Sequence, residues 1–265
     1  MDTWRGKWAV VTGASAGIGK ALAVELAARG ANLVLTARRR DRLEELAREL
    51  AAKYAIRIEI CAADLAQTSG PEEVFEFTKG KGIDVELLVN NAGFGAYGHF
   101  ANMKLERILE MVQVNVSAVV HLTHLYLPLM IARKRGDILI VGSTASFQGV
   151  PFLTTYGATK AFDLVFAEAL AEETRPHGVR VCALCPGSTT SEFHHVAGQP
   201  KHILRKQETA EKVARTGLRA LASGKSYVIS GTKNYAGAHI QRLLPRSFAT
   251  RIVGKMFRPK AGGHA

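Results

Sequence analysis

Residues 10–21 read VVTGASAGIGKA and join a short apolar run to the start of an amphipathic segment. Gly13, Gly17 and Gly19 are therefore expected at a turn from a strand into a helix, with GxxxGxG spacing. Glycines at such a turn let the backbone approach a pyrophosphate, and the free N–H groups and the positive helix end attract its charge. The segment predicts an α/β fold that opens with a nucleotide-binding loop. A glycine-rich turn that binds no ligand is the alternative.

Apolar segments typical of strands alternate with amphipathic segments along most of the chain. Strands are expected near residues 7–12, 32–37, 56–61, 86–90, 137–142, 179–184 and 226–230. Helices are expected near residues 17–29, 40–53, 71–79, 103–133, 155–175 and 208–222. Helices of this length between strands imply right-handed crossovers and a parallel sheet covered on both faces. We expect a doubly wound α/β fold in three layers, with one domain over residues 1–230 and an extension over residues 231–265.

The composition places the chain among folded proteins. Of its 265 residues 47% are hydrophobic and only 8 are proline, which excludes a disordered protein. No run reaches the roughly 18 apolar residues of a membrane span, since His121, His124 and Pro128 interrupt residues 118–132. The short N-terminal run WAVV argues against a signal peptide, and three cysteines favour a reducing compartment. The expected location is the cytoplasm.

The net charge of +12 is concentrated near the C-terminus. Residues 1–200 hold 21 basic and 21 acidic side chains, whereas residues 201–265 hold 14 basic and 2 acidic ones. The tail over residues 233–257 mixes these cations with apolar residues and predicts two short amphipathic helices on either side of Pro245. Such a face suits a membrane surface, which makes residues 233–265 a candidate peripheral anchor. Packing on the chain's own body or on a second subunit is the alternative; no nucleic acid is expected, because few planar side chains are available for base stacking.

Arginines follow the second expected strand, at the position where a side chain would contact the part of the cofactor that differs between NAD and NADP. An acidic residue there would bind the ribose hydroxyls of NAD, but the chain has Ala37, Arg38 and Arg39. A guanidinium can bind a 2′-phosphate instead, which favours NADPH/NADP over NAD; a solvated helix start is the alternative. Asp64 ends the third expected strand and is predicted either to meet the adenine amino group or to cap the next helix.

Six motifs in order make the chain resemble the short-chain dehydrogenase/reductase family over about residues 6–230. The motifs are TGASAGIG at 12–19, NNAG at 90–93, VNV at 114–116, VGSTAS at 141–146, YGATK at 156–160 and PGSTTSEF at 186–193. The resemblance implies a Rossmann fold, an NADP-dependent oxidoreductase and a homodimer or homotetramer.

The resemblance places the family's catalytic residues on Asn115, Ser143, Tyr156 and Lys160. Tyr156 would be the general acid in ketone reduction and the general base in alcohol oxidation. Because a free tyrosine has a pKa of about 10, the ammonium of Lys160 and the oxidised nicotinamide are expected to lower it. Lys160 would also bind the nicotinamide ribose, and Ser143 would bind the substrate carbonyl. Asn115 would hold a water that extends a proton relay.

The loop and the resemblance together also predict the cofactor contacts. The expected residues are Gly13, Ser15, Gly17, Ile18, Gly19, Arg38, Arg39, Asp64, Leu65, Asn91, Ala92, Gly93, Tyr156, Lys160, Pro186, Gly187, Thr189 and Ser191. Thr189 stands where the family usually has Val or Ile, so a backbone contact to the carboxamide is expected there.

No metal site is expected. Cys182 and Cys185 are three apart along an expected strand, so their side chains should point to opposite faces. His121 and His124 are three apart on an expected helix, but no carboxylate or cysteine accompanies them in the sequence.

Aromatic residues near the expected substrate loops favour an apolar substrate. They include Phe94, Tyr97 and members of residues 147–152, while residues 188–207 are expected to close over the substrate. Tails like this one resemble a branch of the family that acts on lipid-like ketones, including 3-oxoacyl chains and steroids. The leading hypothesis is an NADPH-dependent reductase of an apolar ketone or aldehyde, cytoplasmic or peripheral to a membrane. The alternative is a non-catalytic NADP-binding module whose tail docks on a partner or membrane.

Overall fold

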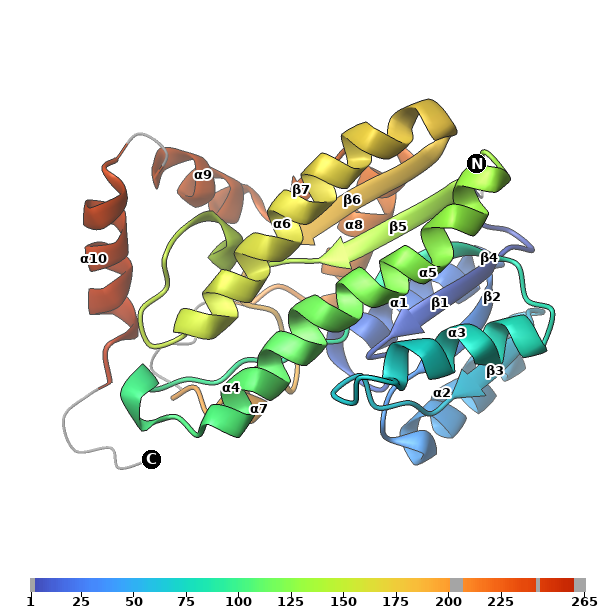
Figure 1. The fold of residues 1–265 in the computed structure, drawn as a ribbon, viewed down its shortest axis with the longest axis horizontal. Helices are drawn as coiled ribbons and strands as arrows, with labels where there is room; N and C mark the ends of the chain where they lie inside the picture. Colours follow the sequence, from blue (N-terminus) through green and yellow to red (C-terminus); the bar gives the residue numbers. More distant parts are fainter. Residues whose placement is uncertain (1–2, 201–206, 242–243, 260–265) are drawn as a thin grey trace.

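A parallel sheet forms the centre of the molecule (Figure 1). The computed structural model describes residues 3–200, 207–241 and 244–259. Within these residues seven strands pair in the order β3-β2-β1-β4-β5-β6-β7. The strands are β1 (Trp8–Thr12), β2 (Asn32–Thr36), β3 (Ile58–Cys61), β4 (Val85–Asn90), β5 (Gly136–Val141), β6 (Val179–Cys185) and β7 (Tyr227–Ile229). The order reverses between β1 and β4, and a crevice at such a switch point is where doubly wound sheets bind ligands.

Helices cover both faces of the sheet, which confirms the three-layer prediction. One face carries α1 (Gly17–Ala28), α2 (Arg40–Lys53) and α8 (Ala210–Ala222). The other face carries α3 (Gly70–Gly80), α5 (Ala118–Ala132) and α6 (Thr154–Thr174). The remaining elements are α4 (Leu105–Val112), α7 (Phe193–Val196), α9 (Thr232–Ile240), α10 (Arg246–Phe257) and the short helical turns η1 (Phe100–Asn102), η2 (Gln113–Ser117), η3 (Thr144–Phe147) and η4 (Arg175–His177).

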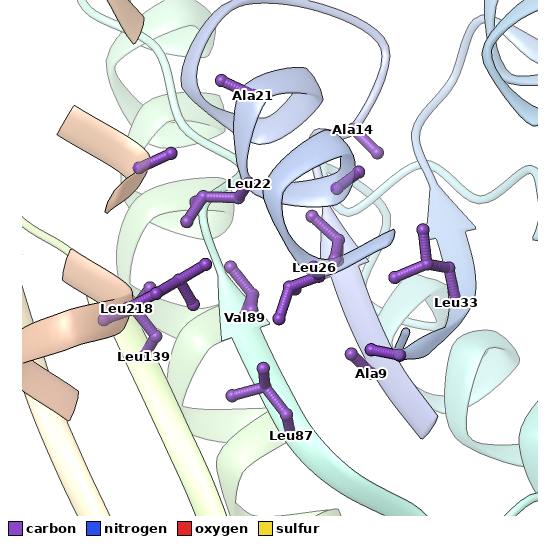
Figure 2. Packing of buried hydrophobic residues seen from close by; sticks show 14 of the residues in the cluster. Ala9, Ala14, Ala21, Leu22, Leu26, Leu33, Leu87, Val89, Leu139 and Leu218 are labelled. Carbon is purple, nitrogen blue, oxygen red and sulfur yellow. The ribbon is translucent and has the colours of Figure 1, made fainter. Parts of the chain in front are cut away.

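Leucines four apart give α1 its buried face. Figure 2 shows Leu22 and Leu26 directed at the sheet, where Leu87 of β4 lies. Both leucines of α1 are fully buried, and each such side chain contributes about 2 kcal/mol of hydrophobic free energy. The helix ends before Gly30, whose φ of +78° lies in the left-handed region that glycine adopts without strain. This packing fixes the start of α1 beside the glycine loop.

The helix expected over residues 103–133 is interrupted by a π-helical segment. The chain runs from α4 through η2 into α5, and η2 holds Asn115. A π turn inside an α-helix often marks a functional position. Leu105–Ala132 is long and apolar enough to cross a membrane by length and composition, but Leu122, Tyr126 and Met130 are buried against the sheet. Part of this segment therefore packs in the core of the described structure.

The C-terminal residues form the two helices that the sequence predicts. α9 and α10 lie on either side of Pro245, beyond the carboxyl ends of β5 and β6 (Figure 1). Residues 242–243 between them, 201–206 in the expected substrate loop and 260–265 at the end of the tail are outside the described residues. Ala249 is buried, and Val253 and Phe257 pack against a small cluster in the η3 region. α10 therefore packs on the domain.

Candidate active site

A cleft of about 990 Å³ opens at the carboxyl ends of the strands. Its lining includes every residue that the sequence assigns to cofactor or chemistry except Asn115, which is fully buried behind it. One part is formed by the glycine loop and the ends of the first strands, and the other by α7, α9 and α10. The cleft therefore joins the glycine loop and the strand ends to a region with many apolar side chains.

The glycine loop is packed too closely for side chains. A Cβ added to Gly19 would lie 2.2 Å from the carbonyl oxygen of Gly13, and one added to Gly13 would lie 2.8 Å from Nδ2 of Asn91. Gly13 and Gly17 also have φ values of +65° and +55°. The Asn91 amide donates to the Thr12 carbonyl at 2.8 Å and holds the loop against the neighbouring strand. Bare backbone thus faces the cleft at the N-terminus of α1, as a bound pyrophosphate requires.

Two of the predicted arginines line the cleft beside this loop. Arg39 donates to Oγ of Ser15 at 3.1 Å and to the carboxylate of Glu192 at 2.9 Å, whereas Arg38 is exposed. Arg42, which the sequence reasoning did not consider, forms an ion pair with the same carboxylate. The hydrogen bonds with Arg42 and Arg39 lower the pKa of Glu192. Cationic groups thus gather beside the glycine loop, around a carboxylate from residues 188–207, and their contact with a 2′-phosphate stays a prediction.

Asp64 lies in the cleft wall and does not cap α3. Its Oδ1 accepts from the backbone N–H of Ala66 at 3.0 Å. α3 begins at Gly70, with Ser69 at its N-cap position. The capping alternative is therefore wrong for this helix, because five residues of turn intervene before it starts. The adenine contact stays a prediction.

Tyr156 and Lys160 lie one turn apart on α6, and the loop after β5 brings Ser143 to them. Nζ of Lys160 donates to the carbonyl of Val141 at 2.8 Å and to Oδ2 of Asp163 at 2.9 Å. Ser143 is the N-cap of η3 and accepts from the N–H of Ala145 at 3.1 Å. Ser143 thus caps η3 and also lines the cleft, and its contact with the substrate carbonyl stays a prediction.

The pKa of the Tyr156 phenol is raised by the protein's own groups. Burial is the largest cause, although part of the side chain reaches the cleft, and the Lys160 ammonium and the Ser143 hydroxyl oppose it. For Lys160, burial alone would lower the pKa, but the Asp163 carboxylate raises it above its usual value. The sequence predicts that Lys160 acidifies the phenol. That influence is present, but it does not outweigh burial.

Asn115 ties the wall of the cleft to the catalytic helix. Its Oδ1 accepts from the N–H of Phe94 at 3.1 Å, and its Nδ2 donates to the carbonyl of Phe94 and to Oγ1 of Thr159. A Cβ at Gly93 would lie 3.1 Å from this amide oxygen and 3.4 Å from Nζ of Lys160. The ammonium therefore lies within contact distance of position 93, where a side chain would be tightly placed. The predicted water-holding role of Asn115 stays a prediction.

The remaining part of the cleft is lined by side chains from the expected substrate segments and by α10, which the sequence did not place there; Tyr97 is not among the lining residues. Phe193 of α7 packs on the Tyr156 ring with centroids 5.0 Å apart. Tyr97, expected near the substrate, donates to the backbone carbonyl of Phe257 at 2.7 Å and so joins α10 to the wall. Val150 and Val253 line the same region. The spacing of apolar residues in the sequence predicted that α10 has an apolar face. It did not indicate which surface of the protein that face covers.

The described residues contain no group of three or more His, Cys, Asp or Glu side chains able to hold a metal. Cys182 and Cys185 are buried in β6 and belong to the clusters on opposite faces of the sheet, as predicted. α3 places the carboxylate of Glu72 3.4 Å from Nε2 of His121, a neighbour that the local sequence does not show.

Comparisons with known proteins agree with this geometry. A family model described as short chain dehydrogenase matches residues 7–201. A very-long-chain 3-oxoacyl-CoA reductase of Phaeosphaeria nodorum is 39% identical over 269 residues, which cover 96% of this chain and 76% of the relative. An inactive hydroxysteroid dehydrogenase-like protein 1 of Homo sapiens is 37% identical over 186 residues, which cover 68% of this chain and 55% of the relative. The chain thus spans between about half and three quarters of these relatives' length.

Among solved structures, a short-chain dehydrogenase from Sphingobium yanoikuyae in complex with NADPH has a TM-score of 0.82 and 28% identity. The alignment covers 98% of each chain. The similarity therefore includes the C-terminal helices as well as the sheet.

Proposed function

Because the chain belongs to the short-chain dehydrogenase family, we propose that it is an NADPH-dependent reductase of apolar ketones or aldehydes, reversible under excess alcohol. The observation that carries the proposal is that Tyr156 lines the same cleft as the glycine loop, one turn from Lys160 on α6, hydrogen-bonded to Ser143 and packed on Phe193. NADP binding fits the loop packing, the arginines beside it and the NADPH in the related structure. The cofactor, when bound, supplies the hydride.

The chain's own residues supply binding, orientation and the proton. The glycine loop holds the pyrophosphate, and Arg38 and Arg39 hold the 2′-phosphate. Ser143 donates a hydrogen bond to the substrate carbonyl oxygen, where negative charge develops. The Tyr156 hydroxyl gives its proton to that oxygen, and Lys160 stabilises the phenolate that remains. A raised pKa suits this direction, because the phenol stays protonated at neutral pH.

The substrate is proposed to be a lipid-like carbonyl compound, either a 3-oxoacyl chain or a steroid-like ketone. Phe94, Val150, Leu153 and Val253 give the cleft an apolar wall near the catalytic group. The name of the Phaeosphaeria nodorum relative supports a 3-oxoacyl thioester.

A panel of carbonyl compounds tests the activity. It contains 3-oxoacyl thioesters of increasing chain length, a ketosteroid and a ketose, each followed by loss of NADPH absorbance. We expect turnover on the apolar members and none on the ketose. Activity confined to the ketose would contradict the proposed substrate class. NADPH binding without turnover on any member would favour the alternative, a non-catalytic NADP-binding module, which the retained Tyr156 and Lys160 do not favour.

We also propose a cytoplasmic location with a peripheral membrane contact through the extension that follows residue 230. Phe248, Ile252 and Met256 follow one another at helical spacing on α10 and are 50%, 41% and 39% exposed. Arg251 and Lys255 are exposed on the same helix. Apolar residues flanked by cations bind anionic interfaces.

Co-sedimentation with anionic vesicles tests the membrane contact. Phe248→Glu is expected to reduce binding, since it places a carboxylate on the exposed apolar side of α10; Val165→Glu, on an exposed part of α6, is the control because it adds the same charge. Equal sedimentation of the two variants would contradict the contact.

A homodimer or homotetramer is proposed from the family alone, and sedimentation equilibrium measures the number of subunits.

A further inference from the structure

Asp163 is a buried carboxylate next to the catalytic group that the proposed mechanism does not use. It lies on α6, within a turn of Lys160, and is 0% exposed. Its Oδ2 accepts from Nζ of Lys160 at 2.9 Å, while its Oδ1 has no hydrogen-bond partner among the described residues. A charge at such a position is costly unless it is paired, so the ion pair with Lys160 is the interaction that holds it there.

The ion pair limits what Lys160 can offer to the cleft. An ammonium has three N–H donors, and two of them are used by the carbonyl of Val141 and by Asp163. One donor is left for the nicotinamide ribose. The Val141 carbonyl and the Asp163 carboxylate also hold the Lys160 ammonium in one place, next to Gly93.

The carboxylate also weakens the effect of the ammonium on Tyr156. The Lys160 ammonium favours the phenolate, and the Asp163 carboxylate paired with it at 2.9 Å opposes that effect, although it is the smaller of the two. The other groups that bear on the phenol are the buried Cys185 thiol of β6, which also disfavours the phenolate, and the Ser143 hydroxyl, which favours it. Asp163 is thus the one carboxylate among the described groups that act on the phenol.

We propose that Asp163 is a positioning residue that holds the Lys160 ammonium in a neutral pair and thereby raises the pH at which the Tyr156 phenol gives up its proton. The inference rests on the proposed function. It adds to that function the pH range in which the catalytic phenol supports reduction or oxidation. A protonated phenol can donate to a carbonyl oxygen but cannot accept a proton from an alcohol. Asp163 does not change the overall equilibrium; it sets the pH above which reduction slows and oxidation becomes possible.

Asp163→Asn tests the proposal, because it removes the charge and keeps an oxygen to accept from Lys160. The chain has 6 tyrosines, so the titration of Tyr156 is isolated by subtracting the tyrosinate absorbance of the matching Tyr156→Phe protein. The titration is run in the NADP⁺ complex, whose positive nicotinamide lowers the midpoint. We expect the midpoint to fall by about one pH unit in Asp163→Asn, a typical effect of removing one nearby charge. Glu172→Gln on the same helix, exposed and paired with Arg175, should leave it unchanged.

The kinetic readout is the pH profile. The falling limb of the pH profile of kcat/KM for carbonyl reduction should move to lower pH by about one unit, as the absorbance midpoint does. A lower rate with an unmoved limb is what a merely structural role gives, and it would overturn the proposal. An unchanged absorbance midpoint would overturn it as well.

The absorbance experiment needs no turnover, so it separates this inference from the proposed function. A shifted midpoint in a protein that reduces no carbonyl would reject the function and support the role of Asp163. Asp163→Ser, smaller and also uncharged, is the second variant if Asp163→Asn does not fold. Loss of folding in both would contradict the proposal, which assigns the carboxylate to proton control and not to stability.

Discussion

Gly19→Ala should weaken the binding of NADPH, because it adds a methyl group to the closely packed glycine loop. The new Cβ would lie 2.2 Å from the Gly13 carbonyl oxygen and 2.5 Å from Nδ2 of Asn91, whereas ordinary contacts begin at 3.4 Å. The Gly13 carbonyl must therefore move by more than 1 Å, and the loop that faces the pyrophosphate moves with it. Inserting a methyl into packed structure costs about 2 kcal/mol, which is about a 30-fold rise in Kd if the strain falls on the bound loop.

The assay is a fluorescence titration with NADPH, with circular dichroism as the check on folding. Gly80→Ala is the matched control, because the same methyl at the end of α3 meets nothing within 4 Å. Its Kd should equal that of the wild type. A Kd of Gly19→Ala for NADPH within about twofold of the wild-type value corresponds to a loss of less than about 0.5 kcal/mol of binding free energy. That result would refute the assignment of this loop to the pyrophosphate.

Two further predictions concern the arginines. Arg38→Asp should shift cofactor preference from NADPH toward NADH, and an unchanged ratio of the two kcat/KM values would count against the 2′-phosphate assignment. Glu192→Gln should tighten NADPH binding by about threefold and leave NADH binding unchanged, because it frees Arg39 and Arg42 from an exposed carboxylate. The gain should shrink at high salt, which screens exposed charges, and an equal gain for NADH would contradict the reasoning.

Periodic patterns in the sequence account for most of the fold. Each expected strand lies within two residues of an observed one, because buried parallel strands are short apolar runs bounded by turns. The glycine loop is equally local, since its spacing and its position between strand and helix are both visible in twelve consecutive residues. Tyr156 and Lys160 share a helix face for the same reason, as four-residue spacing fixes their relative position.

Contacts between distant segments account for what the sequence did not predict. Glu192 meets Arg39 across 153 residues, and no local pattern pairs them. His121 meets Glu72 because α3 and α5 pack on the same face. Asp163 is three residues from Lys160, so their proximity was predictable, but its complete burial was not. The apolar face of α10 was visible, whereas its place over the cleft depended on the tertiary fold.

The central claim is that the Tyr156 hydroxyl donates the proton during carbonyl reduction. Its most direct test compares wild type and Tyr156→Phe for steady-state NADPH oxidation on the best carbonyl substrate and for NADPH affinity on the same preparations. The account predicts a fall in kcat of at least about 100-fold, the usual contribution of a positioned general acid, with an NADPH Kd within about twofold of the wild type. Equal kcat values in the two proteins would contradict it.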